Sequence, residues 1–189
     1  MTKLQARNYF TNLRKKLSED EINEKSEKIF NQWLVSGLNY FQSFHIFLSI
    51  IEKKEINTSF FLQYLWLNNK NVYCSKTKKN QLEHFKLTSD TSLKISKWGI
   101  PEPYNENPIN LNTIDCVFIP LLAYDTSGNR IGYGKGYYDK FLSSHPNATK
   151  IGLSFFNPVS KIEDLEVTDI PLDYIITPEF YSAFPIEEK

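Results

Sequence analysis

The chain has 189 residues, of which 41% are hydrophobic and 23% are charged, and its 22 basic residues balance its 22 acidic ones. This composition is ordinary for a folded protein and excludes a disordered chain. Because the formal net charge is zero, the field of the whole protein attracts neither nucleic acid nor an anionic membrane, and we expect no partner of either kind. Any anion that the protein binds must be held by a local cluster of donors.

The length suits one domain spanning residues 1–189. No stretch approaches the about 20 apolar residues that a membrane helix needs, and the first ten residues lack the apolar run of a secretory signal. Cys74 and Cys116 lie in apolar segments without a CxxC partner, which indicates buried free thiols in a reducing compartment. We therefore expect a cytoplasmic protein.

Helical and strand patterns alternate in the first half of the chain. Apolar residues at helical spacing predict helices at 2 to about 17, after residue 18, and at 59–67, and short apolar runs predict strands at 43–50 and 72–75. Ser18 and Glu21 form a capping box at the start of the second helix, and Thr58 is the expected cap of the third.

The second half continues the alternation. Residues 98–103 cannot be helical because they contain a glycine and two prolines. Strands are expected at 115–119, 151–155 and 174–177, with a turn at 125–129 and a helix that ends near 142. Strands that are nearly continuously apolar and alternate with helices indicate an α/β fold, a three-layer α/β/α arrangement around a mostly parallel sheet.

Four of the seven glycines lie within nine residues, at 128, 132, 134 and 136. Glycines spaced by two allow the backbone to approach a ligand closely and to turn successive N–H groups toward it. Such a nest at the start of a helix binds anions, and Lys135 adds a positive charge. The spacing is neither GxxxxGK[ST] nor GxGxxG, so neither a P-loop nor a dinucleotide site is indicated. Phosphate is the expected guest.

A carboxylate follows the glycines at Asp139. A carboxylate beside a phosphate nest repels the phosphate unless a cation lies between them, which predicts a Mg²⁺ site. A second carboxylate is then needed, and Asp169 and Asp173 are both candidates. By itself, Asp139 also fits the simpler interpretation of a negative charge in the first turn of a helix.

The run IPLLAYDTSGNRIGYGKGYYDKFL, residues 119–142, closely resembles the signature of the 5-formyltetrahydrofolate cyclo-ligase family. The elements Trp98-Gly-Ile-Pro-Glu-Pro103 and Asp169-Ile-Pro-Leu-Asp173 resemble further motifs of this family. The resemblance implies ATP- and Mg²⁺-dependent closure of 5-formyltetrahydrofolate to 5,10-methenyltetrahydrofolate, with release of ADP and phosphate. ATP would phosphorylate the formyl oxygen, and N10 would then attack the activated carbon. It also implies small-molecule partners only, and we expect a monomer.

The resemblance assigns a role to each site residue. Lys135 and Glu55 would be catalytic, and Asp139 and Asp169 would hold Mg²⁺. ATP would be bound by Lys3, Arg7, Arg14, Arg130, Ile131, Gly132, Tyr133, Gly134, Lys135, Gly136, Tyr137 and Tyr138. The folate would be bound by Leu48, Glu55, Trp98, Tyr133, Gly134, Lys135, Gly136 and Tyr137.

The chain departs from the family pattern in three places. The loop from Leu48 to Glu55 is about two residues longer than is common, Thr11 and Leu13 stand where many members carry arginine, and Tyr133 stands where relatives often carry arginine or glycine.

Two alternatives stay open: a non-catalytic module that senses ATP or folate, and a relative of sugar-phosphate isomerases or coenzyme A transferases. His45, His84 and His145 have no ligand spacing, and we expect them to be structural or exposed.

Overall fold

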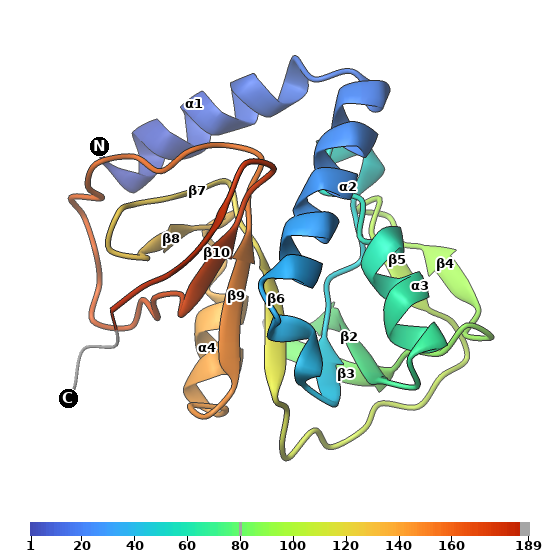
Figure 1. Ribbon diagram of the computed structural model, residues 1–189. Helices are drawn as coiled ribbons and strands as arrows, with labels where there is room; N and C mark the ends of the chain where they lie inside the picture. Colours follow the sequence, from blue (N-terminus) through green and yellow to red (C-terminus); the bar gives the residue numbers. More distant parts are fainter. Residues whose placement is uncertain (80, 186–189) are drawn as a thin grey trace.

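A twisted seven-stranded sheet runs through the computed structural model, which describes residues 1–79 and 81–185 (Figure 1). Its strand order is β11-β10-β9-β6-β1-β2-β3. The strands are β1 (Ser43–His45), β2 (Asn71–Lys78), β3 (Gln81–Lys86), β6 (Cys116–Pro120), β9 (Thr149–Leu153), β10 (Tyr174–Ile176) and β11 (Tyr181–Ala183). The five inner strands pair in parallel, and the two edge strands pair antiparallel. The prediction of a mostly parallel sheet is confirmed.

Two short hairpins stand apart from this sheet. One consists of β4 (Leu93–Ile95) and β5 (Pro101–Pro103), and the other of β7 (Ala123–Tyr124) and β8 (Arg130–Ile131). The turn of the second hairpin is built around Asp125, whose carboxylate accepts hydrogen bonds from the backbone N–H groups of Ser127, Asn129 and Ile162. The predicted turn at 125–129 is therefore confirmed.

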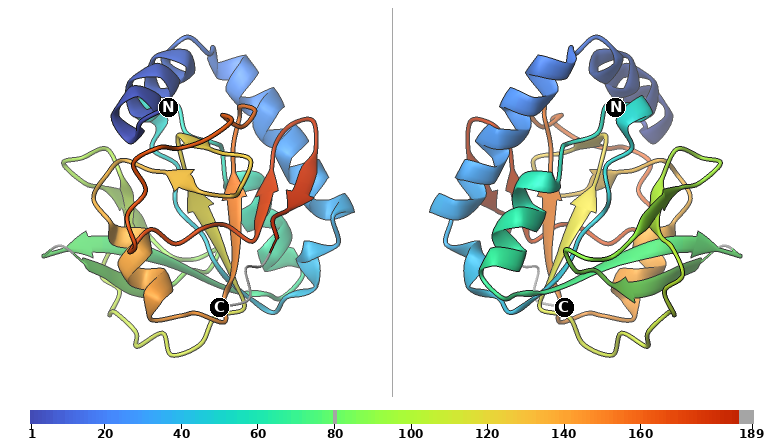
Figure 2. Two further views of the ribbon diagram at one scale, coloured as in Figure 1. Left: turned by 90° about the vertical axis from the view of Figure 1, so that its left-hand side faces the viewer. Right: turned by 90° about the vertical axis from the view of Figure 1, so that its right-hand side faces the viewer.

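Helices cover both faces of the sheet. Figure 2 shows α2 (Glu19–Val35) on one side of the strands and α4 (Tyr137–Ser143) on the other. Helix α3 (Ser59–Leu67) packs beside α2. Among the described residues, no helix has both the length and the apolar character needed to cross a membrane.

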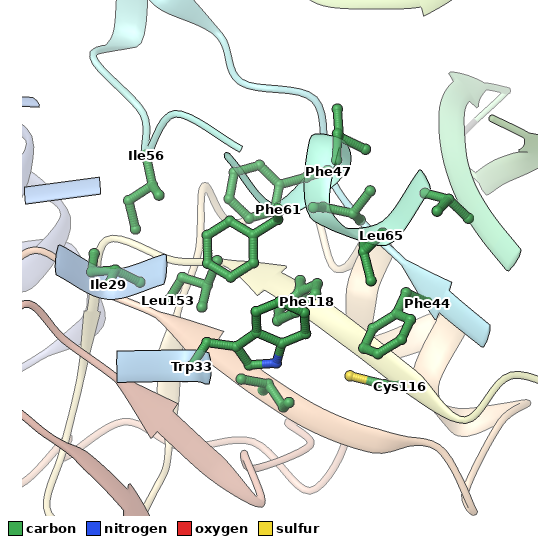
Figure 3. Packing of buried hydrophobic residues seen from close by; sticks show 14 of the residues in the cluster. Ile29, Trp33, Phe44, Phe47, Ile56, Phe61, Leu65, Cys116, Phe118 and Leu153 are labelled. Atoms are coloured by element: carbon green, nitrogen blue, oxygen red, sulfur yellow. The ribbon is translucent and has the colours of Figure 1, made fainter. Parts of the chain in front are cut away.

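The main core lies between α2, α3 and the sheet (Figure 3). Trp33 is fully buried and makes edge contacts with Phe44 and Phe118, while Phe61 tilts against it. Truncating a buried tryptophan costs about 3–5 kcal/mol of stability, so this cluster fixes how α2 and α3 sit on the sheet. Cys74 and Cys116 are buried free thiols, as expected.

Helix α1 (Lys3–Lys15) lies across the edge of the sheet where the parallel strands end (Figure 1). Thr2 and Gln5 form its capping box. Ala6 and Phe10 are buried against Leu122 and Ile131 next to the β7–β8 hairpin. This packing places the polar face of α1 beside the glycine-rich segment.

One local prediction is wrong in a way that shapes the site, and a second is confirmed with a different hydrogen-bonding pattern. The expected strand at 43–50 ends at His45 because the backbone beyond it bonds to side chains: Ile50 N–H donates to Glu55, and Phe47 C=O accepts from the Thr58 hydroxyl. Thr58 is the N-cap of α3, as predicted, but its side chain makes no capping hydrogen bond. Asn57 supplies one instead, since its side-chain oxygen accepts from Ser59 N–H at 3.1 Å.

Candidate functional site

The predicted site residues gather where the parallel strands end at their carboxyl edge. In parallel α/β sheets this edge is the usual place for ligands, because the loops that leave successive strands meet there. Glu55 lies on the segment after β1, and residues 132–136, which we call the glycine loop, lie between β8 and α4. Helix α1 supplies Lys3, Arg7 and Arg14.

The glycine loop has a backbone that other residues rarely adopt. Gly134 and Gly136 have φ values of +84° and +66°, and Gly136 immediately precedes α4. The Arg7 guanidinium lies against the loop, where Nε donates to Gly132 C=O at 3.0 Å and a Cβ added to Gly134 would come within 3.1 Å of Cζ. Lys135 is exposed. The loop thus presents a cationic, glycine-lined surface that suits an anion.

A hydrogen-bonded bridge joins α1, the glycine loop and the segment after β1. Arg14 donates to the Tyr133 hydroxyl at 2.5 Å, and that hydroxyl donates to Glu55 Oε1 at 2.5 Å. Arg14 and Glu55 are both buried, and the ammonium of Lys53 lies 4.3 Å from the centre of the Tyr133 ring. Burial and the neighbouring Glu55 charge raise the pKa of Tyr133, so its phenol stays neutral and remains a donor.

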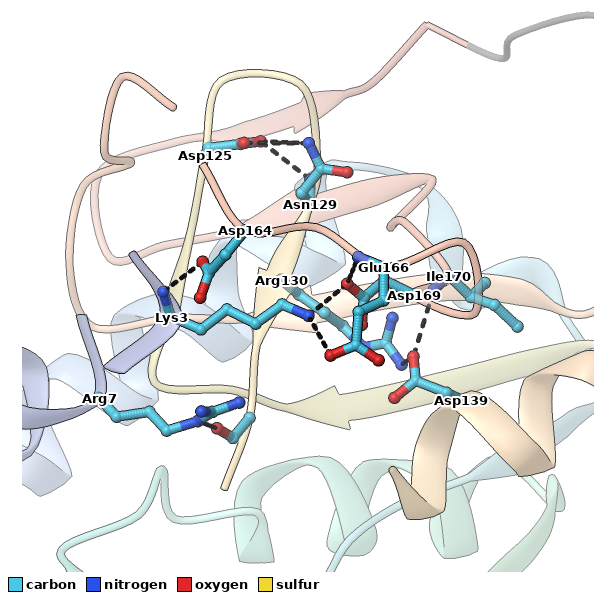
Figure 4. A network of polar contacts seen from close by, with 11 residues as sticks. Lys3, Arg7, Asp125, Asn129, Arg130, Asp139, Asp164, Glu166, Asp169 and Ile170 are labelled. Atoms are coloured by element: carbon cyan, nitrogen blue, oxygen red, sulfur yellow. Dashed lines mark hydrogen bonds and ion pairs between the residues drawn. The ribbon is translucent and has the colours of Figure 1, made fainter. Parts of the chain in front are cut away.

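Two carboxylates face each other across Arg130 (Figure 4). Asp139 Oδ1 accepts from Arg130 at 2.8 Å and from Ile170 N–H at 3.2 Å. Asp169 Oδ2 lies 2.5 Å from Lys3 Nζ. Burial lowers the pKa of Lys3, but the hydrogen bond and charge of Asp169 outweigh burial and the pKa is raised. The Arg130 side chain is only 6% exposed, and its Nη1 has no hydrogen-bond partner among the described residues.

The described residues contain no group of three or more histidine, cysteine or acidic side chains that could enclose a metal by themselves. The donor set nevertheless fits Mg²⁺, which is usually held by one or two carboxylates together with waters and substrate phosphates. The hydrogen bonds described for Asp139 use one of its oxygens, and the contacts described for Asp169 likewise use one. Asp173 instead accepts from Lys150 N–H at 2.7 Å and pairs with the Lys150 ammonium at 2.9 Å.

Two pockets flank the bridge. The inner pocket has a volume of about 10 Å³ and is lined by Arg14 and Glu55 together with apolar side chains that include Phe47, Ile56 and Phe155. The outer pocket, of about 260 Å³, lies between the polar face of α1 and the loop and is lined by Arg7, Asn8, Thr11, Asn12, Lys15, Leu122 and Tyr133.

Some predicted site residues lie outside this cluster. Trp98 is 67% exposed on the loop between β4 and β5, although a Cβ added to the neighbouring Gly99 would lie 3.2 Å from Glu52 Oε2. Leu48 packs at the margin of the main core, and Tyr138 packs against the core on the α4 side. Ile131 is buried under α1, so it can offer a ligand only its backbone.

Sequence reasoning missed two groupings. Lys53 belongs to the lengthened segment before Glu55, and nothing in its sequence context indicates that it contacts Tyr133. The three histidines have no ligand spacing in the sequence, yet His84 Nδ1 lies 3.2 Å from His45 Nε2, and the rings of His84 and His145 both pack on Phe141. They are structural, as expected. Burial lowers the pKa of His84 to about 4, so this histidine is neutral near pH 7.

Comparison with known proteins settles the family. The sequence model of the 5-formyltetrahydrofolate cyclo-ligase family matches residues 1–178. The chain belongs to this family. Among curated family members, the 5-formyltetrahydrofolate cyclo-ligase of Haemophilus influenzae is 33% identical over 155 residues, covering 78% of this chain and 83% of that protein. A probable 5-formyltetrahydrofolate cyclo-ligase of Caenorhabditis elegans is 27% identical over 193 residues, covering 92% and 91%.

Solved structures of two 5,10-methenyltetrahydrofolate synthetases share the fold. The 5,10-methenyltetrahydrofolate synthetase of Aquifex aeolicus superimposes with a TM-score of 0.82 and 25% identity, covering 100% of this chain and 96% of that one. The enzyme of the same name from Mycoplasma pneumoniae gives a TM-score of 0.74 at 25% identity, covering 94% and 99%.

Proposed function

We propose that this cyclo-ligase family member uses ATP to convert 5-formyltetrahydrofolate to 5,10-methenyltetrahydrofolate, with release of ADP and phosphate. The observation that carries the proposal is the folding of the family's signature segment. It forms an anion-suited glycine loop that contacts both the basic face of α1 and the buried Glu55. An enzyme that transfers a phosphoryl group from ATP to a folate needs a phosphate site and a folate site side by side.

The chemistry explains why ATP is required. The formyl group is an amide, and direct attack on its carbon by N10 would have to expel oxide or hydroxide. In the proposed route the formyl oxygen attacks the γ-phosphorus and ADP leaves. N10 then attacks the formyl carbon, the C–O bond breaks, phosphate departs and N10 loses its proton. The protein mainly positions the reactants and stabilises charge on the transferred group.

The glycine loop is suited to the phosphates. Backbone N–H groups at Gly134 and Gly136, with the exposed Lys135 ammonium between them, would stabilise charge on the transferring phosphoryl group. Arg7 borders both this loop and the outer pocket, whose volume of about 260 Å³ gives room for the nucleoside of ATP. Arg130, which has one buried nitrogen without a partner in the described part of the chain, is a further donor at this end.

Asp139 and Asp169 would hold Mg²⁺, since the contacts described for each carboxylate use only one of its two oxygens. When bound, the ion would neutralise charge on the ATP phosphates. Asp173 is less suited because it pairs with Lys150, whereas the charges of Asp139 and Asp169 both act on Arg130. Asp169→Asn is therefore expected to raise the Mg²⁺ concentration needed for half-maximal activity at least about tenfold, equivalent to about 1.4 kcal/mol, whereas Asp173→Asn should leave that concentration unchanged.

Glu55 is suited to the folate side. Its Oε2 is fixed by Ile50 N–H at 2.9 Å, and its other oxygen faces Tyr133. We propose that Glu55 accepts a hydrogen bond from the pterin or from the N10 side of the substrate and so sets the geometry of attack. A Glu55→Ala enzyme with normal affinity for 5-formyltetrahydrofolate would exclude this role.

Production of the methenyl compound, followed by its absorbance, tests the proposal. Product formation that depends on 5-formyltetrahydrofolate and ATP is the expected result. A protein that binds both compounds and forms no product would instead be a sensing module. We further propose that all of residues 1–189 act as one domain and as a monomer in the cytoplasm. The two buried free thiols support a reducing compartment.

A further inference from the structure

The Tyr133 hydroxyl bonds to both charged side chains that line the inner pocket. The described lining contains Arg14 and Glu55, and every other member is apolar or uncharged. Arg14 donates to the hydroxyl and the hydroxyl donates to Glu55, each at 2.5 Å. Arg14 Nε, which is also buried, has no partner among the described residues. The phenol therefore occupies the polar groups that an incoming ligand would use.

The inner pocket has no room for a folate ring while this bridge is intact. Its volume is about 10 Å³, whereas pockets for small organic ligands measure about 300–1,000 Å³. Apolar walls and two buried charges suit a flat ring with donors and acceptors on its edge. A ligand that reaches Glu55 must therefore displace the Tyr133 hydroxyl, and the glycine loop that carries Tyr133 must shift with it.

The phosphate side constrains the same loop. Arg7 Nε donates to Gly132 C=O at 3.0 Å, and the guanidinium lies against Gly134. A phosphate that enters the nest at Gly134 competes with the loop for Arg7, so its binding also loosens the loop. Ligands on both sides thus break contacts of one short segment, residues 132–134.

We propose that Tyr133 is a positioning residue that couples the binding of the two substrates. In the free enzyme its hydroxyl holds Arg14 and Glu55 in place of the folate, and either substrate releases it. This inference rests on the proposed function, since it takes ATP and 5-formyltetrahydrofolate as the ligands.

The sign of the coupling follows from linkage. If each substrate alone must break the bridge, the second substrate to bind does not meet that cost again, and each tightens the binding of the other by the same factor. The coupling free energy cannot exceed the free energy that the hydrogen bonds of the bridge contribute in the free enzyme. Because the bridge contains hydrogen bonds to charged groups, we expect about a tenfold effect. Removing the hydroxyl should abolish the coupling and tighten folate binding to the free enzyme.

The test compares wild type with Tyr133→Phe, which keeps the ring and loses the hydroxyl. Calorimetry would measure the Kd of 5-formyltetrahydrofolate with and without Mg²⁺ and a non-hydrolysable ATP analogue. Wild type should bind the folate about tenfold more tightly with the analogue. Tyr133→Phe should bind it about as tightly without the analogue as wild type does with it. Tyr181→Phe, on the exposed edge strand β11, is the matched control and should behave as wild type.

Two results would overturn the inference. In one, Tyr133→Phe binds the folate more weakly than wild type when the analogue is absent, as a residue that merely contacts substrate would. In the other, Tyr133→Phe retains the wild-type coupling factor. A wild-type protein that fails to bind 5-formyltetrahydrofolate under any of these conditions would overturn the proposed function itself.

Discussion

Replacing Gly134 with alanine tests whether the glycine loop needs its left-handed backbone. Gly134 has a φ of +84°, and a Cβ added there would lie 3.1 Å from Cζ of Arg7. The left-handed conformation costs about 1–2 kcal/mol for a non-glycine residue. Displacing Arg7 would also weaken its hydrogen bond to Gly132 C=O, worth about 0.5–1.5 kcal/mol. We therefore expect the free energy of unfolding to fall by about 2 kcal/mol.

The neighbouring glycines provide graded controls. Gly136 has a φ of +66° but open space around an added Cβ. Gly136→Ala should therefore lower the free energy of unfolding only by the cost of the left-handed backbone, about 1–2 kcal/mol. Gly132 has neither a positive φ nor a neighbour within 4 Å of an added Cβ. Gly132→Ala should therefore change stability by no more than about 0.5 kcal/mol.

Urea unfolding measures these differences, because a change in midpoint at constant m-value reports a change in stability. In the product assay, Gly134→Ala should raise the KM for ATP at least about tenfold, equivalent to about 1.4 kcal/mol, since the loop must be restored to its strained form before phosphate can bind. Equal destabilisation by all three substitutions, or a Gly132→Ala variant as impaired as Gly134→Ala, would refute the reasoning.

Three further predictions follow from buried polar groups. Asp125→Ala removes the acceptor of three backbone N–H groups. It should lower the free energy of unfolding, measured in urea, by about 3 kcal/mol or more. A loss below about 1 kcal/mol would contradict the role given to this turn. Burial raises the pKa of Cys74 to about 12, and Cys116 is also buried. A thiol reagent at pH 8 should therefore label neither cysteine in the native protein and both in guanidinium. Rapid labelling of the native protein would show that the thiols are accessible to solvent. Because the pKa of His84 is lowered to about 4, the unfolded chain binds more protons than the native protein between about pH 6.5 and 4. The free energy of unfolding should therefore fall as the pH drops through that range, and it should fall less steeply in His84→Asn. If it falls equally steeply in the variant, other groups cause the pH dependence.

Local signals in the sequence were sufficient for much of the fold. The capping box at Ser18 and Glu21 is present, and the third helix spans Ser59–Leu67 as predicted. Such features depend on residues three or four apart, whose chemistry determines the local backbone. Strand β11 was missed because Tyr181–Ala183 is short and exposed, and it carries no alternating pattern.

The composition of the site was predictable, but its internal contacts were not. The alternating glycines and Lys135 indicate an anion site by themselves, and the resemblance supplied Glu55. The Tyr133–Glu55 hydrogen bond joins residues 78 positions apart, and the His45–His84 contact joins residues 39 apart. Such pairs depend on which strands lie side by side in the sheet, and no spacing along the chain encodes that order.

The most direct test is a product assay with purified protein, 5-formyltetrahydrofolate, ATP and Mg²⁺, in which each component is omitted in turn. Absorbance of 5,10-methenyltetrahydrofolate should rise only when both the folate and ATP are present, and a folded Lys135→Ala variant should be inactive. If the wild type binds ATP and the folate but no absorbance develops, the glycine loop is a binding site and the catalytic assignment is wrong.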